Sequence, residues 1–175
     1  MGYPISGAHY NPATTLAVLI RGKINLKDSL MYWIFQFVAS CCAAYFYFKI
    51  WGRNIGNPRP NMEINILKPL AIEMVFTFLM MLVILFVATS KKTEGNSYYG
   101  LAIGLVVTGL ATAASAISGA AFNPAVATGP LLVDIFFGTC QCHPGSYAWI
   151  YFIGPFTGAA VAAFTFRFLS PEDFQ

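Results

Sequence analysis

Ile5-Ser6-Gly7-Ala8-His9-Tyr10-Asn11-Pro12-Ala13 returns later in the chain as Ile117-Ser118-Gly119-Ala120-Ala121-Phe122-Asn123-Pro124-Ala125. A single Asn-Pro-Ala triplet would indicate no more than a helix cap. Two copies in matching contexts, each followed by a short apolar run, indicate an internal repeat. The two runs, at about 12–20 and about 124–133, are too short to cross a bilayer, which takes about 20 residues. Paired short segments of this kind predict half-helices in a repeated membrane fold.

Each Asn-Pro pair is suited to start a helix, because Asn is favoured at the N-cap and proline at the first helical position. A half-helix that starts inside the membrane directs its free N–H groups and the positive end of its dipole there. Irregular backbone at that depth is tolerated only where it is buried in protein or lines a water-filled cavity. Asn11 and Asn123 therefore either cap helices and do nothing more, or also stand at a constriction that disfavours cations but not neutral solutes.

The rest of the chain is too apolar for a soluble domain. Hydrophobic residues make up 57% and charged residues 10% of it, and its mean hydropathy is +0.63, whereas soluble domains carry about 25% charged residues. Four segments are long and apolar enough to span a bilayer, at about 30–50, 70–89, 98–117 and 147–169. We predict an all-α membrane protein of four full transmembrane helices and two half-helices. The net charge of +3 lies in the connecting loops and gives no reason to expect a nucleic-acid partner.

Neither a metal nor a cofactor is expected. The loop at 140–143 contains two cysteines and a histidine, but a zinc site needs a fourth ligand, and the other histidine, His9, is far away in the sequence. Loop cysteines without a metal are the favoured interpretation. Passive permeation requires no nucleophile, acid–base pair or cofactor.

Over nearly its whole length the chain resembles the aquaporin and glycerol-facilitator family, also called the major intrinsic proteins. The resemblance is carried by the two Asn-Pro-Ala segments, by Ala102-Ile103-Gly104 and by Trp149-Ile150-Tyr151-Phe152-Ile153-Gly154-Pro155-Phe156. It implies one aquaporin-like domain over 1–175, built on an inverted repeat. Family members have six full helices and two half-helices and usually form tetramers with one pore per subunit. Because the chain begins at the first half-helix loop, we expect the first two family helices to be absent.

The resemblance also assigns individual residues. The pore motif comprises Asn11, Pro12, Ala13, Asn123, Pro124 and Ala125. Glu73 resembles the membrane-embedded glutamate of the fourth family helix, which orders a pore-lining loop by hydrogen bonding, and Gln36 falls on the third family helix. An intramembrane carboxylate is a candidate functional group by default. We favour a scaffold role for Glu73 over a role in transport.

The residues expected at the family's selectivity filter depart from its pattern. The position of the filter arginine, directly after the second Asn-Pro-Ala, is Val126. The filter histidine of water-selective members is replaced by Ala111, and the loop position is Ala120. These three side chains are small and apolar, so the resemblance implies a degenerate filter that is wider and less polar than a strict water filter.

Two functional hypotheses follow, and neither is an enzyme. The first is a channel for passive permeation of water or small neutral solutes, assembled as a homo-oligomer. The second is a non-conducting, degenerate aquaporin that serves as a structural subunit of a larger membrane complex, with other membrane subunits supplying the missing helices. In both, the chain is a multi-pass integral membrane protein in contact with lipid. The surface membrane is the family default, and an organellar membrane, for example the mitochondrial inner membrane, fits a complex subunit.

Overall fold

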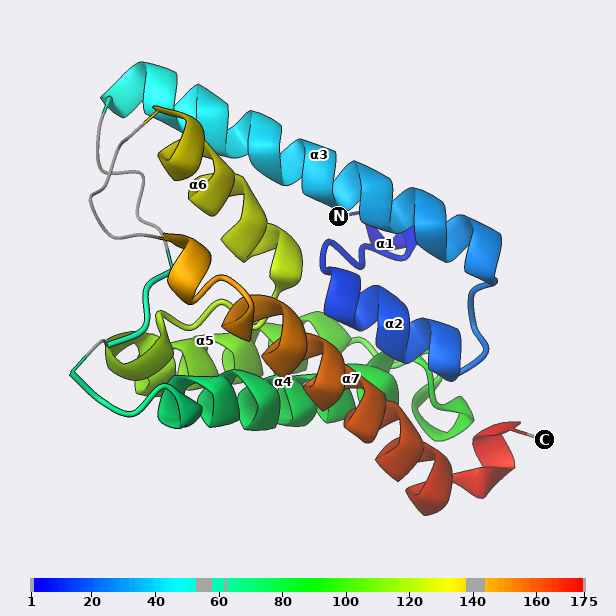
Figure 1. Ribbon diagram of the computed structural model, residues 1–175. Helices are drawn as coiled ribbons and strands as arrows, with labels where there is room; N and C mark the ends of the chain where they lie inside the picture. Colours follow the sequence, from blue (N-terminus) through cyan, green and yellow to red (C-terminus); the bar gives the residue numbers. More distant parts are fainter. Residues whose placement is uncertain (1, 53–57, 62, 138–143, 175) are drawn as a thin grey trace.

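The computed structural model describes residues 2–52, 58–61, 63–137 and 144–174. Over these residues the chain is helical and has no strand, which confirms the predicted all-α class (Figure 1). The α-helices are α1 (Tyr3–Ser6), α2 (Pro12–Ile20), α3 (Leu26–Trp51), α4 (Leu67–Ala88), α5 (Tyr99–Ser118), α6 (Pro124–Phe137) and α7 (Ile150–Leu169). Short 3-10 turns lie at η1 (Lys91–Thr93), η2 (Pro144–Ser146) and η3 (Pro171–Phe174). The loop at 140–143, for which we favoured cysteines without a metal, lies outside the described residues.

Four of these helices, α3, α4, α5 and α7, are long and apolar enough to cross a membrane. Helices α2 and α6 have only 9 and 14 residues and are too short to do so. Each short helix starts at the proline of an Asn-Pro-Ala segment. The predicted combination of four full helices and two half-helices is therefore confirmed.

Several helix ends differ from the bounds expected from the sequence, and the largest differences are at the start of α3 and the end of α6. Helix α3 begins at Leu26, before the expected start, because Asn25 caps it: the Asn25 side-chain oxygen accepts a hydrogen bond from the Asp28 N–H at 2.8 Å. Helix α6 continues to Phe137, past the expected end near residue 133. Asp134 interrupts the apolar run in the sequence, yet it lies inside the helix and is buried, with 2% of the residue exposed.

The helices form two groups that half-helix α2 joins (Figure 1). Helix α3 packs along α6, and α4 packs against both α5 and α7. Half-helix α2 contacts α3 on one side and α7 on the other. The largest hydrophobic core lies between α2, α4, α5 and α7 and includes Met81, Leu85 and Phe166, all fully buried.

Glycines allow helices α4 and α7 to approach closely. A Cβ atom added at Gly154 would lie 2.8 Å from the Cβ of Glu73. At Gly158 it would overlap the carbonyl oxygen of Met74 and lie 3.0 Å from the backbone nitrogen of Phe78. Small residues at membrane helix interfaces let the backbones pack closely in this way. The contact leaves the Glu73 side chain fully buried.

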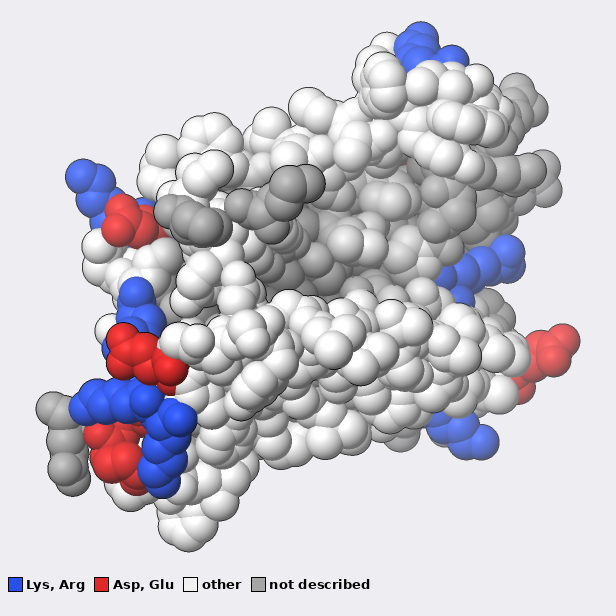
Figure 2. Space-filling view, turned by 180° about the vertical axis from the view of Figure 1, so that it is seen from behind, with Lys and Arg blue, Asp and Glu red and all other residues white. Residues whose placement is uncertain are grey.

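Exposed charged residues gather at two ends of the molecule, and an uncharged region separates them (Figure 2). This region is the surface expected of a protein that spans a bilayer, since charged side chains are costly in the hydrocarbon. Glu73 and Asp134, which lie within helices, are both buried. The distribution agrees with a multi-pass membrane protein.

The close approach of α4 and α7 predicts that Gly158→Ala destabilises the protein. The added methyl group meets backbone atoms of α4 that cannot rotate away, and overpacking of this kind costs about 1–3 kcal/mol. Thermal unfolding in detergent measures the change. Gly104→Ala in α5 is the matched control, because nothing lies within 4 Å of its added Cβ. A Gly158→Ala protein as stable as the Gly104→Ala protein would contradict the packing argument.

Candidate functional site

The two half-helices are capped in the same way by the predicted asparagines. The Asn11 side-chain oxygen accepts a hydrogen bond from the Ala13 N–H at 2.8 Å, and that of Asn123 accepts one from the Ala125 N–H at 3.0 Å. The prolines that follow each asparagine, and both alanines, are buried. Each cap satisfies a free N–H of the first helical turn.

The asparagine side chains also bond across to the opposite loop. The Asn11 amide nitrogen donates to the Phe122 carbonyl oxygen at 3.0 Å, and the Asn123 amide nitrogen donates to the Tyr10 carbonyl oxygen at 3.0 Å. These two bonds are reciprocal and hold the half-helix N-termini together. Each amide group has two hydrogens, so one hydrogen per asparagine is left over by this bond. Two positive helix ends thus face each other.

The loops before the asparagines repeat the same unusual backbone. Gly7 and Gly119 have φ of +68° and +82°, Ala8 and Ala120 have +50° and +52°, and the residues before the asparagines, Tyr10 and Phe122, have +47° and +48°. Left-handed backbone is uncommon for residues other than glycine and must be held by its surroundings. Among the described residues, no donor bonds the carbonyl oxygens of 7–9 or of 119–121. Both loops therefore offer free acceptors.

The second loop is held by Glu73 of α4. One carboxylate oxygen of Glu73 accepts hydrogen bonds from the Ser118 hydroxyl at 2.7 Å and from the Ala121 N–H at 3.0 Å. The other accepts one from the Phe122 N–H at 2.7 Å. The Tyr151 hydroxyl of α7 donates to the Ser118 carbonyl oxygen at 2.5 Å. Three donors of the second loop thus bond one buried carboxylate, and this arrangement would allow Glu73 to order the loop.

Side chains of α3 bond the first loop and the half-helix α2 that follows it, and the loop has no counterpart of Glu73 among the described residues. The Tyr32 hydroxyl donates to the Ser6 carbonyl oxygen, as Tyr151 does to Ser118. Gln36 donates from its amide nitrogen to the Thr15 hydroxyl at 3.0 Å. Within the described part of the chain, no acceptor is bonded to the N–H groups of His9 and Tyr10, which correspond in the repeat to Ala121 and Phe122. The two halves of the repeat are therefore unequally supported.

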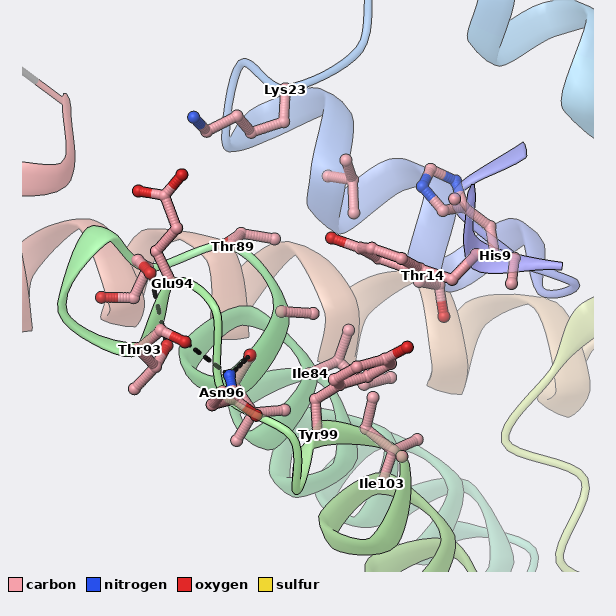
Figure 3. Close-up of a pocket in the computed structure, with 18 of the residues that line it drawn as sticks. His9, Thr14, Lys23, Ile84, Thr89, Thr93, Glu94, Asn96, Tyr99 and Ile103 are labelled. Carbon is pink, nitrogen blue, oxygen red and sulfur yellow. Dashed lines mark hydrogen bonds between the residues drawn. The ribbon is translucent and has the colours of Figure 1, made fainter. Parts of the chain in front are cut away.

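A cavity of about 1030 Å³ lies beside the first loop (Figure 3). His9 and Thr14 line it from the α2 side, and Ile84, Tyr99 and Ile103 line it from α4 and α5. The three predicted filter residues do not line this cavity. Ala111 and Ala120 pack, partly buried, against the main core, whereas Val126 is 50% exposed.

Sequence reasoning missed the tyrosines that bind the loop carbonyls. Tyr32 lies four residues before Gln36 in α3, and Tyr151 lies four residues before Pro155 in α7. Because α3 and α7 each follow a half-helix, aligning these two helices on each other would have extended the repeat and matched the tyrosines. The bonds themselves join residues 26 and 33 positions apart and cannot be read from hydropathy.

Comparisons with known proteins find relatives over nearly the whole chain. The family model described as major intrinsic protein matches residues 1–166. Aquaporin AqpM of Methanothermobacter thermautotrophicus is 33% identical over 174 residues, which cover 96% of this chain and 70% of the relative. Aquaporin-5 of Sus scrofa is 32% identical, with 95% of this chain and 62% of the relative covered. The solved aquaglyceroporin from Plasmodium falciparum has the same fold, with a TM-score of 0.84 and 20% identity over 98% of this chain and 77% of that chain.

The contacts of Glu73 predict that Glu73→Gln destabilises the second loop. The carboxylate has two acceptor oxygens, one for the Ala121 N–H and one for the Phe122 N–H. Glutamine keeps only one acceptor oxygen and places an NH₂ donor against the N–H that the second oxygen had bonded. Hydrogen bonds to a charged group contribute about 1.5–3 kcal/mol each, so we expect the free energy of unfolding to fall by about that amount. Denaturant titration in detergent measures it, with Glu63→Gln, at an exposed position, as the control. Equal stability of the two variants would show that Glu73 does not hold the loop.

Proposed function

Because the chain belongs to the major intrinsic protein family, we propose that it is a membrane channel that passes water or small neutral solutes passively. Family membership and the four apolar helices make it a multi-pass integral membrane protein and an aquaporin-like channel rather than an enzyme.

The reciprocal bonds of Asn11 and Asn123 are the observation that carries this proposal. They bring two positive helix ends together, which raises the energy of a cation and leaves a neutral solute little affected. The amide hydrogens that these bonds leave over, and the free carbonyls of the two loops, supply donors and acceptors to a passing molecule. Those groups would replace the hydrogen bonds that water or a small alcohol loses on leaving bulk solvent.

The filter positions support a channel that is not restricted to water. Ala111, Ala120 and Val126 carry no hydrogen-bond donor in their side chains and no charge. A site without a directed polar group discriminates weakly between small neutral solutes. We therefore propose that the channel admits solutes such as glycerol as well as water.

Osmotic swelling of reconstituted vesicles tests the proposal. We expect vesicles that contain the protein to change volume faster than protein-free vesicles, in a water gradient and in a glycerol gradient. Asn11→Ala and Asn123→Ala each remove a cap and one bond between the half-helices, so both are expected to slow the volume change. Vesicles that swell no faster with the protein than without it would refute the channel proposal.

Val126→Arg tests the filter separately. An arginine at this half-exposed position adds bulk and hydrogen-bond donors, so glycerol permeability is expected to fall more than water permeability. Stopped-flow light scattering on the same vesicles measures both rates. Val126→Leu, which adds bulk without charge, is the matched control. If Val126→Arg leaves the ratio of the two permeabilities unchanged, residue 126 does not line the path.

A second candidate function is that of a non-conducting subunit in a larger membrane complex, and the unequal support of the two loops favours it. The N–H groups of His9 and Tyr10 would each cost several kcal/mol if they faced lipid without an acceptor. An acceptor on a helix of another membrane subunit, or of a second copy of the chain, would remove that cost. An organellar membrane, such as the mitochondrial inner membrane, fits this function better than the surface membrane.

Purification from the native membrane in mild detergent, followed by mass spectrometry, separates the two candidates. Recovery of the chain in a homo-oligomer whose vesicles swell would favour the channel. Recovery in a large complex of unrelated subunits, together with vesicles that do not swell, would favour the structural function.

A further inference from the structure

A buried arginine joins several segments at the C-terminal end of half-helix α2. Arg21 is 4% exposed, and its Nη2 donates to the Thr89 carbonyl oxygen at 3.3 Å. The same nitrogen lies 3.6 Å from Oδ1 of Asp173, whose side chain is fully buried. The Arg21 guanidinium also lies 4.4 Å from the ring centroid of Phe174 and 5.4 Å from that of Phe166. The end of α2 is thus tied to α4, to α7 and to η3.

The Asp173 oxygen that faces Arg21 also binds a second segment. This oxygen, Oδ1, accepts a hydrogen bond from the Lys91 N–H at 2.7 Å, in the connection between α4 and α5. Burial alone would raise the pKa of Asp173, but hydrogen bonds from Lys91 and Ser90 and the charges of Arg21 and Lys91 outweigh it and lower that pKa. The carboxylate is therefore ionised at neutral pH and bridges α2 to the α4–α5 connection.

The α4–α5 connection is itself tied to the end of α4. The Thr93 hydroxyl donates to the Phe86 carbonyl oxygen at 2.5 Å, and the Asn96 amide donates to the Val87 carbonyl oxygen at 2.7 Å. These bonds hold the connection against the last turn of α4. A displacement of the Lys91 backbone is therefore expected to move the whole α4–α5 connection.

The two segments that Arg21 and Asp173 join both line the cavity. Lys23, just after α2, lines one side, and Glu94, in the α4–α5 connection, lines the other (Figure 3). Thr89, Ser90 and Lys91 also line the cavity. We call the part of the cavity between Lys23 and residues 89–96 the mouth.

We propose that Arg21 and Asp173 are positioning residues that set the width of the mouth. The proposal rests on the channel function proposed above, because the width of a mouth matters for what permeates. Neither residue lines the cavity, so both act through the segments they hold. Removing one partner leaves the other charge buried and uncompensated, which strongly destabilises such a contact. The segments would then separate more often while the helices stay folded.

Two variants break the contact and one matched variant leaves it intact. Asp173→Asn removes the charge but keeps an oxygen for the Lys91 N–H. Arg21→Lys keeps the charge but removes the planar guanidinium, whose Nη2 contacts both Thr89 and Asp173 and which lies over the Phe174 ring, and it serves as the second test. Glu172→Gln is the control, because its ion pair with Lys92, at 2.5 Å, lies on the surface with side-chain exposures of 41% and 70%.

The width of the mouth is measured with spin labels on cysteines introduced at Lys23 and Glu94, in a chain whose own cysteines are serine. Electron–electron double resonance in lipid vesicles gives the distribution of distances between the labels. We expect Asp173→Asn to shift and broaden this distribution and Glu172→Gln to leave it unchanged. Hydrogen exchange of the amides at 90–96 is expected to rise at least about tenfold in Asp173→Asn, because local opening becomes more frequent.

The outcomes separate this inference from the channel function. An unchanged label distance in both Asp173→Asn and Arg21→Lys would overturn the inference, whether or not the vesicles conduct. Wild-type vesicles that do not swell would remove the channel function alone, since the label distance does not depend on conduction. In vesicles that conduct, Asp173→Asn is expected to change the ratio of glycerol to water permeability. Loss of folded protein would lower both rates equally, so an unchanged ratio would reduce Asp173 to a purely structural role.

Discussion

Two amide hydrogen bonds join the halves of this molecule. A helix that begins inside a membrane leaves N–H groups that no water can reach, and its positive dipole end repels a second one. Each asparagine side chain accepts a hydrogen bond from a free N–H of its own helix. Each also donates to a carbonyl oxygen of the opposite loop, which holds the two helix ends together. Neither half-helix is complete without the other. The left-handed backbone of both loops is what brings those carbonyls within reach.

The same repeat is supported differently in its two halves. A buried carboxylate holds the second loop, whereas the Tyr32 hydroxyl of α3 bonds the first loop and the Gln36 amide bonds the half-helix α2 after it. A carboxylate without a cation beside it is tolerated inside the protein because three donors surround it. The first loop keeps two N–H groups unbonded within the described residues. That difference bears on the second candidate function, in which an acceptor of another membrane subunit would bond these groups.

Half-helix α2 is held at both ends by interactions of different kinds. Asn11 fixes its N-terminus with neutral hydrogen bonds, and Arg21 fixes its C-terminus with a buried ion pair and two aromatic rings. A cation at the C-terminus of a helix is favoured by the dipole, as an amide cap is at the N-terminus. A nine-residue helix is marginal by itself. Its position is therefore set by these contacts more than by its own propensity.

The sequence alone determined the repeat, the four spanning helices and the two half-helices, because each depends on local patterns. Hydropathy over about 20 residues defines a span, and Asn followed by Pro defines a helix start. The resemblance to a known family pointed to Glu73, but only the tertiary structure identified Ser118, Ala121 and Phe122 as its donors, 45 to 49 positions away. The pairing of Arg21 with Asp173 was likewise decided by the fold. Such contacts join segments distant in the chain, and no local pattern encodes which segments meet.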